Sequence, residues 1–145
     1  MKKQAGFTLI ELTFVIAGIA VLSALAVPGY DLFLRRTRLS EARAALEGMV
    51  HAENAWHRDH GTFVACAPSS DAIPKGTTSH FDASRAGWKE IGIALDGEVR
   101  YQYEIALEGK TFRAIARGDL DGDGKPSTIE IRGDDFSIQA TDELE

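Results

Sequence analysis

The sequence has few of the residues that build disulfide frameworks or common catalytic sites. Its 145 residues include one cysteine, Cys66, so no disulfide can form within a single chain. We interpret Cys66 as a small buried or loop residue, with an intermolecular disulfide or thiol chemistry as the alternatives. No zinc-ligand spacing, glycine-rich phosphate loop or Ser/His/Asp motif is present, and we therefore predict that the protein is not an enzyme. His57 and His60 are three residues apart, outside any metal motif, and we interpret them as solvated or helix-end residues.

Positive charge is also scarce. The formal net charge is −6 and the sequence pI is about 5.2. Nucleic-acid binding requires a basic face, so we infer no nucleic-acid partner. A hydrophobic content of 44% and a charged content of 26% are typical of a globular protein. The length fits one modest domain with an N-terminal appendage.

What the sequence does contain is one long apolar run. Residues 7–27 form a stretch of 21 residues with one charge, Glu11. As a helix this stretch would be about 32 Å long, close to the roughly 30 Å hydrocarbon core of a bilayer. The basic start MKKQA predicts that this end stays in the cytoplasm. Two alternatives are a secretory signal cleaved at Ala24-Leu25-Ala26 and an uncleaved signal anchor. Neither explains Glu11, because a carboxylate inside a bilayer costs about 2.5–3.5 kcal/mol or more.

The stretch Gly6-Phe7-Thr8-Leu9-Ile10-Glu11 resembles the N-terminal motif of type IV prepilins and related pseudopilins, and the similarity extends to about residue 60. The resemblance implies that a prepilin peptidase cuts after Gly6 and methylates the new N-terminus, Phe7. The mature chain would have 145 − 6 = 139 residues. It also implies a homo-oligomeric helical filament, built by an inner-membrane assembly machinery.

Three functions follow from these observations. The leading one is a structural subunit of a type IV pilus, held in the inner membrane before assembly and then in an extracellular pilus that serves motility, adhesion or DNA uptake. The alternative is a pseudopilin of a type II secretion system, in a periplasm-spanning pseudopilus. The remote alternative is a membrane-anchored calcium- or ligand-binding domain that does not polymerise.

Glu11 has a physical role in the leading hypothesis. Cleavage would create an α-amino group on Phe7, and Glu11 of one subunit could meet that cation on a neighbour. Pairing offsets much of the cost of each charge in an apolar medium, so the carboxylate favours register with another copy. Pro28 ends the apolar run and predicts a kink in an otherwise continuous helix. Gly18 also lowers helix propensity. The resemblance implies that the region from this glycine to Pro28 can lose helix inside a filament, and we expect an intact helix in the isolated subunit and a weakened segment 18–28 in a fibre.

The fold that we predict is α+β: a long N-terminal helix, with a protruding apolar half and an amphipathic half, packed on a C-terminal antiparallel sheet of three or four strands. We divide the chain into a leader peptide (residues 1–6), a transmembrane or filament-core helix (7–29) and a globular pilin domain (30–145). Within the domain we place a helix at 30–60, a loop at 61–87 and the sheet at 88–141. One apolar stripe of the helix should pack on the sheet. Its members are Leu39, Ala42, Leu46, Met49 and Val50.

Alternating residues predict the strands. Residues 99–107 and 112–116 alternate apolar with polar or small side chains around a hairpin turn at 108–110. Residues 127–132 and 136–140 are shorter candidates.

An acidic loop lies between two of these predicted strands. Residues 119–130 fit D-x-D-x-D-G-x₅-E, the spacing of an EF-hand calcium loop. The candidate Ca²⁺ ligands are Asp119, Asp121, Asp123, the Lys125 carbonyl, Ser127 or a water, and Glu130. Both flanks read as strands instead of helices, so this is at most an EF-hand-like loop in a hairpin. An acidic turn that binds nothing is the alternative. No other cofactor is predicted.

Overall fold

The computed structural model describes residues 6–141, except for the side chains at positions 28, 29, 31, 32 and 35. All but the last residue of the predicted leader lies outside this range. The contacts within the chain define two compact units, one that ends at Arg36 and one that begins at Thr37. Each unit has its own packing.

One helix, α1(Leu9–His60), contains 52 residues and belongs to both units. Its backbone is helical through Pro28, which agrees with the continuous helix expected from the sequence. In the first unit the segment Leu9–Val27 is long and apolar enough to cross a membrane, and none of it is buried. The apolar side chains of this segment are therefore not buried by the described residues.

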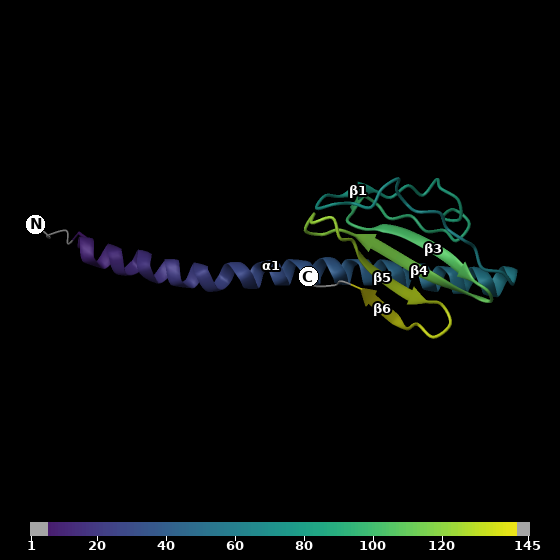
Figure 1. Ribbon diagram of the computed structural model, residues 1–145, viewed down its shortest axis with the longest axis horizontal. Coiled ribbons are helices and arrows are strands. Elements are labelled where there is room, and N and C mark those ends of the chain that lie inside the picture. Colours follow the sequence, from purple (N-terminus) through teal and green to yellow (C-terminus); the bar gives the residue numbers. More distant parts are fainter. Residues whose placement is uncertain (1–5, 142–145) are drawn as a thin grey trace, which may run out of the picture. The chain divides into compact units, whose positions relative to one another are not determined.

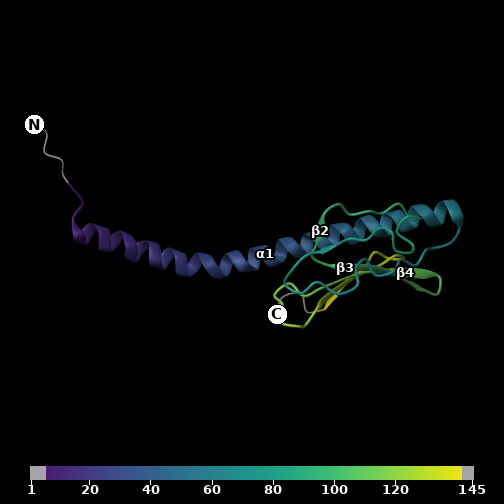
Figure 2. The same ribbon diagram turned by 90° about the horizontal axis from the view of Figure 1, so that it is seen from above.

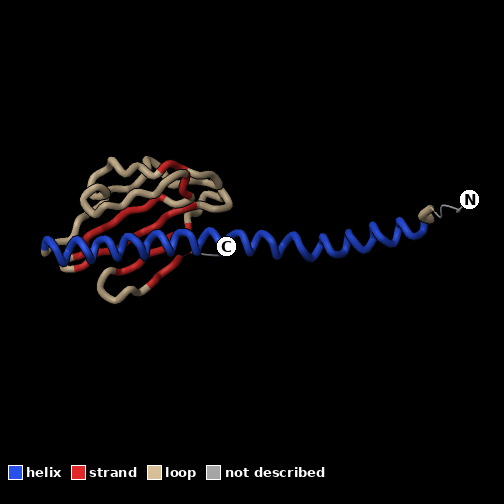
Figure 3. The backbone as a smooth tube through the Cα atoms, turned by 180° about the vertical axis from the view of Figure 1, so that it is seen from behind, coloured by secondary structure: helices blue, strands red, loops and turns tan. Residues whose placement is uncertain are grey.

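In the second unit α1 buries the predicted stripe. Leu39 is 6% exposed, and the other four members of the stripe are fully buried. They pack against a four-stranded sheet in which every neighbouring pair is antiparallel, in the order β3-β4-β5-β6. This part of α1 lies along one face of the sheet (Figures 1 and 3). The strands are β3(Gln102–Glu108), β4(Thr111–Gly118), β5(Ser127–Arg132) and β6(Ile138–Thr141). The predicted α+β architecture is therefore confirmed.

The core lies between the helix and the sheet, which form two layers when viewed from above (Figure 2). Alternate strand residues point into it, because successive side chains in a strand face opposite sides of the sheet. The inward residues of the three long strands are Tyr103, Ile105, Phe112, Ala114, Ala116, Ile129 and Ile131. Because the helix and the sheet each bury one side in this core, the sequence shows an apolar stripe in the helix and alternation in the strands.

The structure corrects the predicted start of the sheet. The four-stranded sheet begins at Gln102 and not at residue 88. The expected strand 99–107 is interrupted at Arg100 and Tyr101. Val99 belongs to β2(Glu98–Val99), which pairs in a separate ladder with β1(Ser79–His80), a strand that lies inside the predicted loop. Trp88 lies in a turn, where its indole N–H donates to the Ala67 carbonyl over 2.8 Å. In this region the alternation of apolar residues indicated which side chains are buried, but it did not indicate that β2 pairs with β1.

The last strand also starts later than predicted. Phe136 has a φ of +55°, which belongs to a turn and not to a strand. Its ring lies against His51 of α1, with 5.7 Å between the ring centroids. β6 therefore begins at Ile138, two residues after the position expected from alternation.

Candidate functional site

The predicted assembly motif begins with a hydrogen-bonded cap on α1. The Glu11 carboxylate accepts hydrogen bonds from both the backbone N–H and the hydroxyl of Thr8, each over 2.8 Å. The Glu11 N–H donates in return to Thr8 Oγ1 over 3.2 Å. This reciprocal arrangement is a capping box, which satisfies donors that the first turn of a helix leaves unpaired.

Sequence analysis did not single out Thr8. The signal was present, because a threonine three residues before a glutamate at the start of an apolar run is the signature of a capping box. The two residues therefore act as a pair, and Glu11 is already hydrogen-bonded within its own chain. Any partner on another chain competes with Thr8 for this carboxylate.

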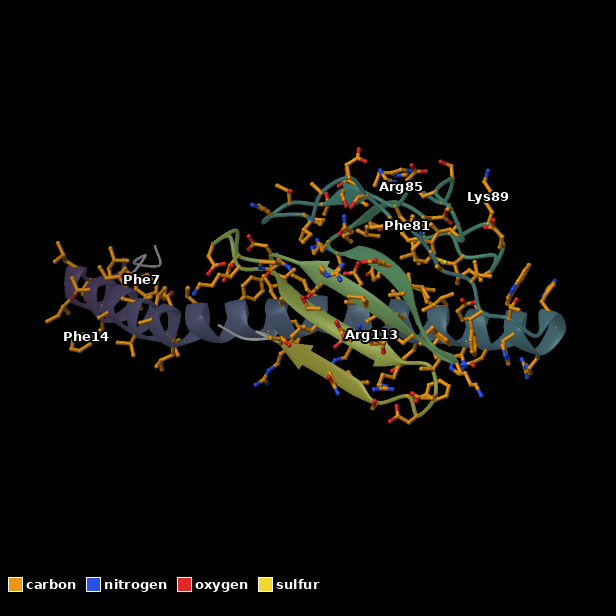
Figure 4. All side chains as sticks on the ribbon, turned by 45° about the vertical axis from the view of Figure 1, so that its right-hand side comes forward. Phe7, Phe14, Phe81, Arg85, Lys89 and Arg113 are labelled. Carbon is orange, nitrogen blue, oxygen red and sulfur yellow. The ribbon has the colours of Figure 1, made fainter. Side chains whose placement is uncertain are left out.

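The residues around the predicted cleavage position are exposed. Gly6 is exposed, and a Cβ added at this position would meet nothing within 4 Å. Phe7 is 86% exposed and carries a peptide nitrogen in this unprocessed chain. Phe7 and Phe14 project from the N-terminal end of the helix (Figure 4). The two residues that flank the predicted cleavage position are therefore both exposed.

The acidic loop connects β4 to β5 and gathers three aspartates. One carboxylate oxygen from each of Asp119, Asp121 and Asp123 lies within 4.8 Å of the others. Ligands on opposite sides of a calcium ion are separated by a similar distance, since Ca²⁺–O distances are about 2.3–2.6 Å. Asp119 is 2% exposed, whereas the other two aspartates are exposed.

Hydrogen bonds within the loop hold these carboxylates. Asp119 accepts the N–H of Gly122 over 2.7 Å and the N–H of Gly124 over 2.9 Å. Both glycines have positive φ, a conformation that few other residues adopt at low cost. Asp123 accepts the Lys125 N–H over 2.8 Å. The loop is therefore folded by its own backbone donors around Asp119.

The structure does not bring Ser127 and Glu130 to this cluster. Both belong to β5, where Ser127 is buried and its hydroxyl donates to the Gly118 carbonyl over 2.9 Å. Glu130 points to the opposite sheet face and pairs with Arg113 of β4 over 2.8 Å. Arg113, labelled in Figure 4, also pairs with Glu108. The strand alternation thus directs Glu130, the twelfth loop position, towards Arg113 and away from the aspartates.

The middle of the second unit contains a buried acid that sequence analysis did not predict. Glu53 of α1 is fully buried, and its Oε1 accepts the Val64 N–H over 2.6 Å. Its Oε2 has no partner within residues 6–141. Burial raises the pKa of Glu53, because the charged form loses hydration. The neighbouring thiol of Cys66 is also buried, and burial together with the charges of Glu53 and Glu90 raises its pKa to about 12.

The histidines of α1 make ring contacts instead of joining a metal group. His57 stacks on Phe63 with 4.1 Å between ring centroids, and His60 stacks on Trp56 with 3.6 Å. The first contact joins the end of α1 to the segment that follows it, whereas the second lies within the helix. Trp56 is partly buried and packs against the core, so it extends the apolar stripe of α1.

A membrane-length apolar helix that continues into an amphipathic helix packed on an antiparallel sheet defines a pilin-type α+β protein. Known proteins agree with this class. The chain is 37% identical over 152 residues to the type IV major pilin protein PilE of Neisseria gonorrhoeae, covering 95% of this chain and 84% of that protein. It is 43% identical over 141 residues to a fimbrial protein of Neisseria meningitidis serogroup A, covering 94% of this chain and 71% of that protein. The chain therefore belongs to the type IV pilin family.

A further relative comes from Escherichia coli (strain K12). Its prepilin peptidase-dependent protein D is 35% identical over 98 residues, which cover 68% of this chain and 66% of that protein. Matches to other neisserial pilins span a third to a half of those proteins. No family profile and no solved structure matches the chain.

Proposed function

We propose that the chain is a membrane-held precursor that polymerises into the helical fibre of a type IV pilus. The observation that supports this most is the segment Leu9–Val27, an apolar helix of 19 residues with no buried part. Burying a large apolar side chain gains about 1.5–3 kcal/mol. A segment that exposes many of them is stable only inside lipid or against copies of itself. Membrane residence and a fibre core offer these two environments in succession.

Processing would allow the subunit to pass from the membrane to the fibre core. A prepilin peptidase cuts between Gly6 and Phe7 and methylates the Phe7 amine, and an inner-membrane machinery extracts the mature subunit. The E. coli relative is named a prepilin peptidase-dependent protein, and this supports the proposal that the present chain is also processed by such a peptidase. The subunit then lies in an extracellular pilus, where it serves motility, adhesion or DNA uptake.

Docking between subunits would use Glu11. The new Phe7 amine of one subunit attracts the Glu11 carboxylate of its neighbour more strongly than the neutral donors of Thr8 do, because the ammonium carries a full positive charge and Coulomb attraction is strong in an apolar fibre core. Glu11 would exchange its capping partner for this cation as the fibre forms. Pro28 leaves one helical carbonyl without its N–H partner, so helix around it can open in the fibre at low cost.

Fibre counts test this proposal. Glu11→Gln keeps the shape and a hydrogen-bonding group but loses the charge that attracts the amine. We expect at least about tenfold fewer fibres by electron microscopy, while mass spectrometry still finds a methylated Phe7 terminus. Glu47→Gln, an exposed acid on the second half of α1, is the matched control and should assemble normally. Equal fibre numbers in the Glu11 variant and the wild type would refute the docking role.

A pseudopilin of a type II secretion system is the second candidate. The acidic loop favours it, since the three aspartates lie near the C-terminal strands, where calcium sites occur in some pseudopilins. Long surface fibres in the wild type, with secretion unchanged in a deletion strain, support the pilus. A secretion defect without long fibres supports the pseudopilin instead.

The same loop supports a proposal of calcium binding. Asp119, Asp121 and Asp123 would supply three ligands, and backbone carbonyls and water the others. With a Kd of roughly 0.1–1 mM and about 1 mM calcium, binding would stabilise the fold by about 0.4–1.4 kcal/mol. We expect the melting temperature to rise with calcium and to fall with chelator. Asp121→Asn should reduce this response, and Glu130→Gln, already engaged by Arg113, should preserve it. A melting temperature that does not change in millimolar calcium would exclude the site.

A further inference from the structure

A second candidate site lies beside the acidic loop. A cavity of about 320 Å³ is lined by Arg38, Gly76, Thr77, Thr78, Arg100 and Leu120. These residues come from α1, the segment before β1, the link between β2 and β3, and the loop after β4. The lining residues that the structure describes include two arginines and two threonines but no acid. The volume is at the lower end of the range for small-molecule sites.

The two arginines have most of their hydrogen-bonding capacity left. A guanidinium carries five N–H donors. Arg38 makes one contact with the described chain, from Nη1 to the Leu120 carbonyl at 3.5 Å. Arg100 makes one contact, from Nη1 to Glu41 at 3.4 Å. Both distances are at the long limit of a hydrogen bond. The remaining donors of both side chains make no hydrogen bond to the described residues, and both side chains line the cavity.

The wall of the cavity is fixed by backbone contacts. The Gly76 N–H donates to the Asp119 carbonyl over 2.6 Å, and the Asp119 N–H donates to the Pro74 carbonyl over 3.0 Å. Gly76 has a φ of +61°, and a Cβ added here would lie 3.7 Å from the backbone of Gly122. The wall is therefore part of the folded domain, and a ligand would meet a preformed surface that costs little entropy to order.

Two acids stand just outside the lining and set limits on the ligand. Glu41 contacts Arg100, and Glu98 accepts a hydrogen bond from the Thr78 hydroxyl. They offset part of the positive charge, and neither is among the residues that line the cavity. A ligand must therefore match the donor geometry in addition to carrying negative charge.

We propose that this cavity binds an oxyanion, a phosphate or a carboxylate, on a molecule about the size of a sugar. The two guanidiniums would hold the anionic oxygens, since arginine donors match carboxylate and phosphate geometry. The threonine hydroxyls and Leu120 would contact the rest of the molecule. The same chemistry could be supplied by a free ligand or by an acidic side chain of a neighbouring subunit.

Titration of the full chain in uncharged detergent micelles tests the chemistry. The probes are glucose 6-phosphate and inorganic phosphate, with glucose as the uncharged control, and the readout is the NMR shift of the arginine Nε–H signals. We expect saturable shifts with both phosphates and none with glucose. Arg38→Gln and Arg100→Gln should each weaken binding about tenfold, as expected for loss of a charge-assisted contact. Arg132→Gln, whose partner is Asp134, is the matched control and should bind normally.

One variant should improve binding. Glu41→Gln removes the acid that contacts Arg100, so the affinity for phosphate should rise by a few fold. The absence of a saturable shift would overturn the proposal, as would unchanged affinity in both arginine variants. These measurements need no polymerisation, so their failure is distinct from a failure of the pilus proposal.

Assembled fibres then identify the source of the anion. If phosphate binds to fibres as it does in micelles, the cavity takes a free ligand. If fibres exclude phosphate and the arginine variants form fibres that dissociate at lower temperature, a neighbouring subunit supplies the carboxylate. Either result supports the oxyanion chemistry found in micelles.

Discussion

The two halves of α1 are made from the same kind of helix but differ in what surrounds them. Between Leu9 and Val27 apolar side chains cover all sides and remain exposed. From Leu39 to Val50 they form one stripe that is buried against the sheet. The first half requires another molecule or a membrane to cover it, whereas the second half is covered by its own chain. In both halves the helix is formed by local backbone hydrogen bonds, but the surface that covers the apolar side chains comes from elsewhere.

The acids on the two halves show the same contrast. Glu11 is exposed and shares a capping box with Thr8, so its oxygens are accessible to a second chain. Glu53 is buried, with one oxygen bonded to Val64 and the other without a partner in the described chain. The exposed acid of the apolar segment is the one that we propose for docking between subunits. A buried acid in a domain affects stability instead.

Truncation of one leucine in each half should give the largest difference. Leu46→Ala removes a fully buried side chain and should lower the free energy of unfolding by about 2–5 kcal/mol. Leu22→Ala, at a position 69% exposed, should change it by less than about 0.5 kcal/mol. Denaturation of the full chain in micelles, followed by fluorescence of Trp56 and Trp88, measures both. Similar losses would mean that the first half is part of the folded domain.

The buried acid should make stability depend on pH. The pKa of Glu53 is raised in the folded state, so folding favours the protonated form and stability decreases as pH rises above the unfolded value of 4.5. Glu53→Gln cannot ionise and should lose this dependence. The difference in unfolding free energy between Glu53→Gln and wild type should therefore shift in favour of the variant by on the order of 1 kcal/mol between pH 4 and pH 8. Thermal melts across this range measure the difference, and parallel curves for the two proteins would contradict it.

Loss of the cap should have a smaller, local effect. Thr8→Val removes the hydroxyl that bonds Glu11 and should weaken the first turn by about 1 kcal/mol. Amide hydrogen exchange of Leu12 in micelles should then accelerate about fivefold. Thr13→Val, which loses only a hydroxyl bond to the Ile10 carbonyl, is the matched control. Equal acceleration in both variants would indicate a general loss of helix and not of its cap.

The smallest effect is expected at the other end of α1. His60→Ala removes the ring stacked on Trp56 and should lower the free energy of unfolding by about 0.5–1 kcal/mol. Arg58→Ala, an exposed residue of the same turn, should have less effect and reports the contribution of charge at the helix C-terminus. If the two variants are equal, the ring contact contributes no more than the charge does.

Some features of the fold and site were readable before the structure. The stripe on α1 and the alternation in β3, β4 and β5 follow periods set by backbone geometry, so they are visible in the order of residues. Those periods could not show that Glu98 and Val99 pair with Ser79 and His80, because a strand partner is chosen by packing far along the chain. Phe136 fitted an alternating pattern yet lies in a turn against His51.

The sequence by itself determined a membrane-length apolar helix and the family, because each depends on neighbouring residues. It also contains the motif at Gly6 and Phe7 on which the processing proposal rests. It also brought three aspartates together, since a short loop needs only its own glycines to curl. Only the tertiary structure decided that Glu130 pairs with Arg113, that Glu53 is buried, and that Arg38 and Arg100 line one cavity. These outcomes depend on which segments pack together, and long-range packing is not encoded in any short stretch of residues.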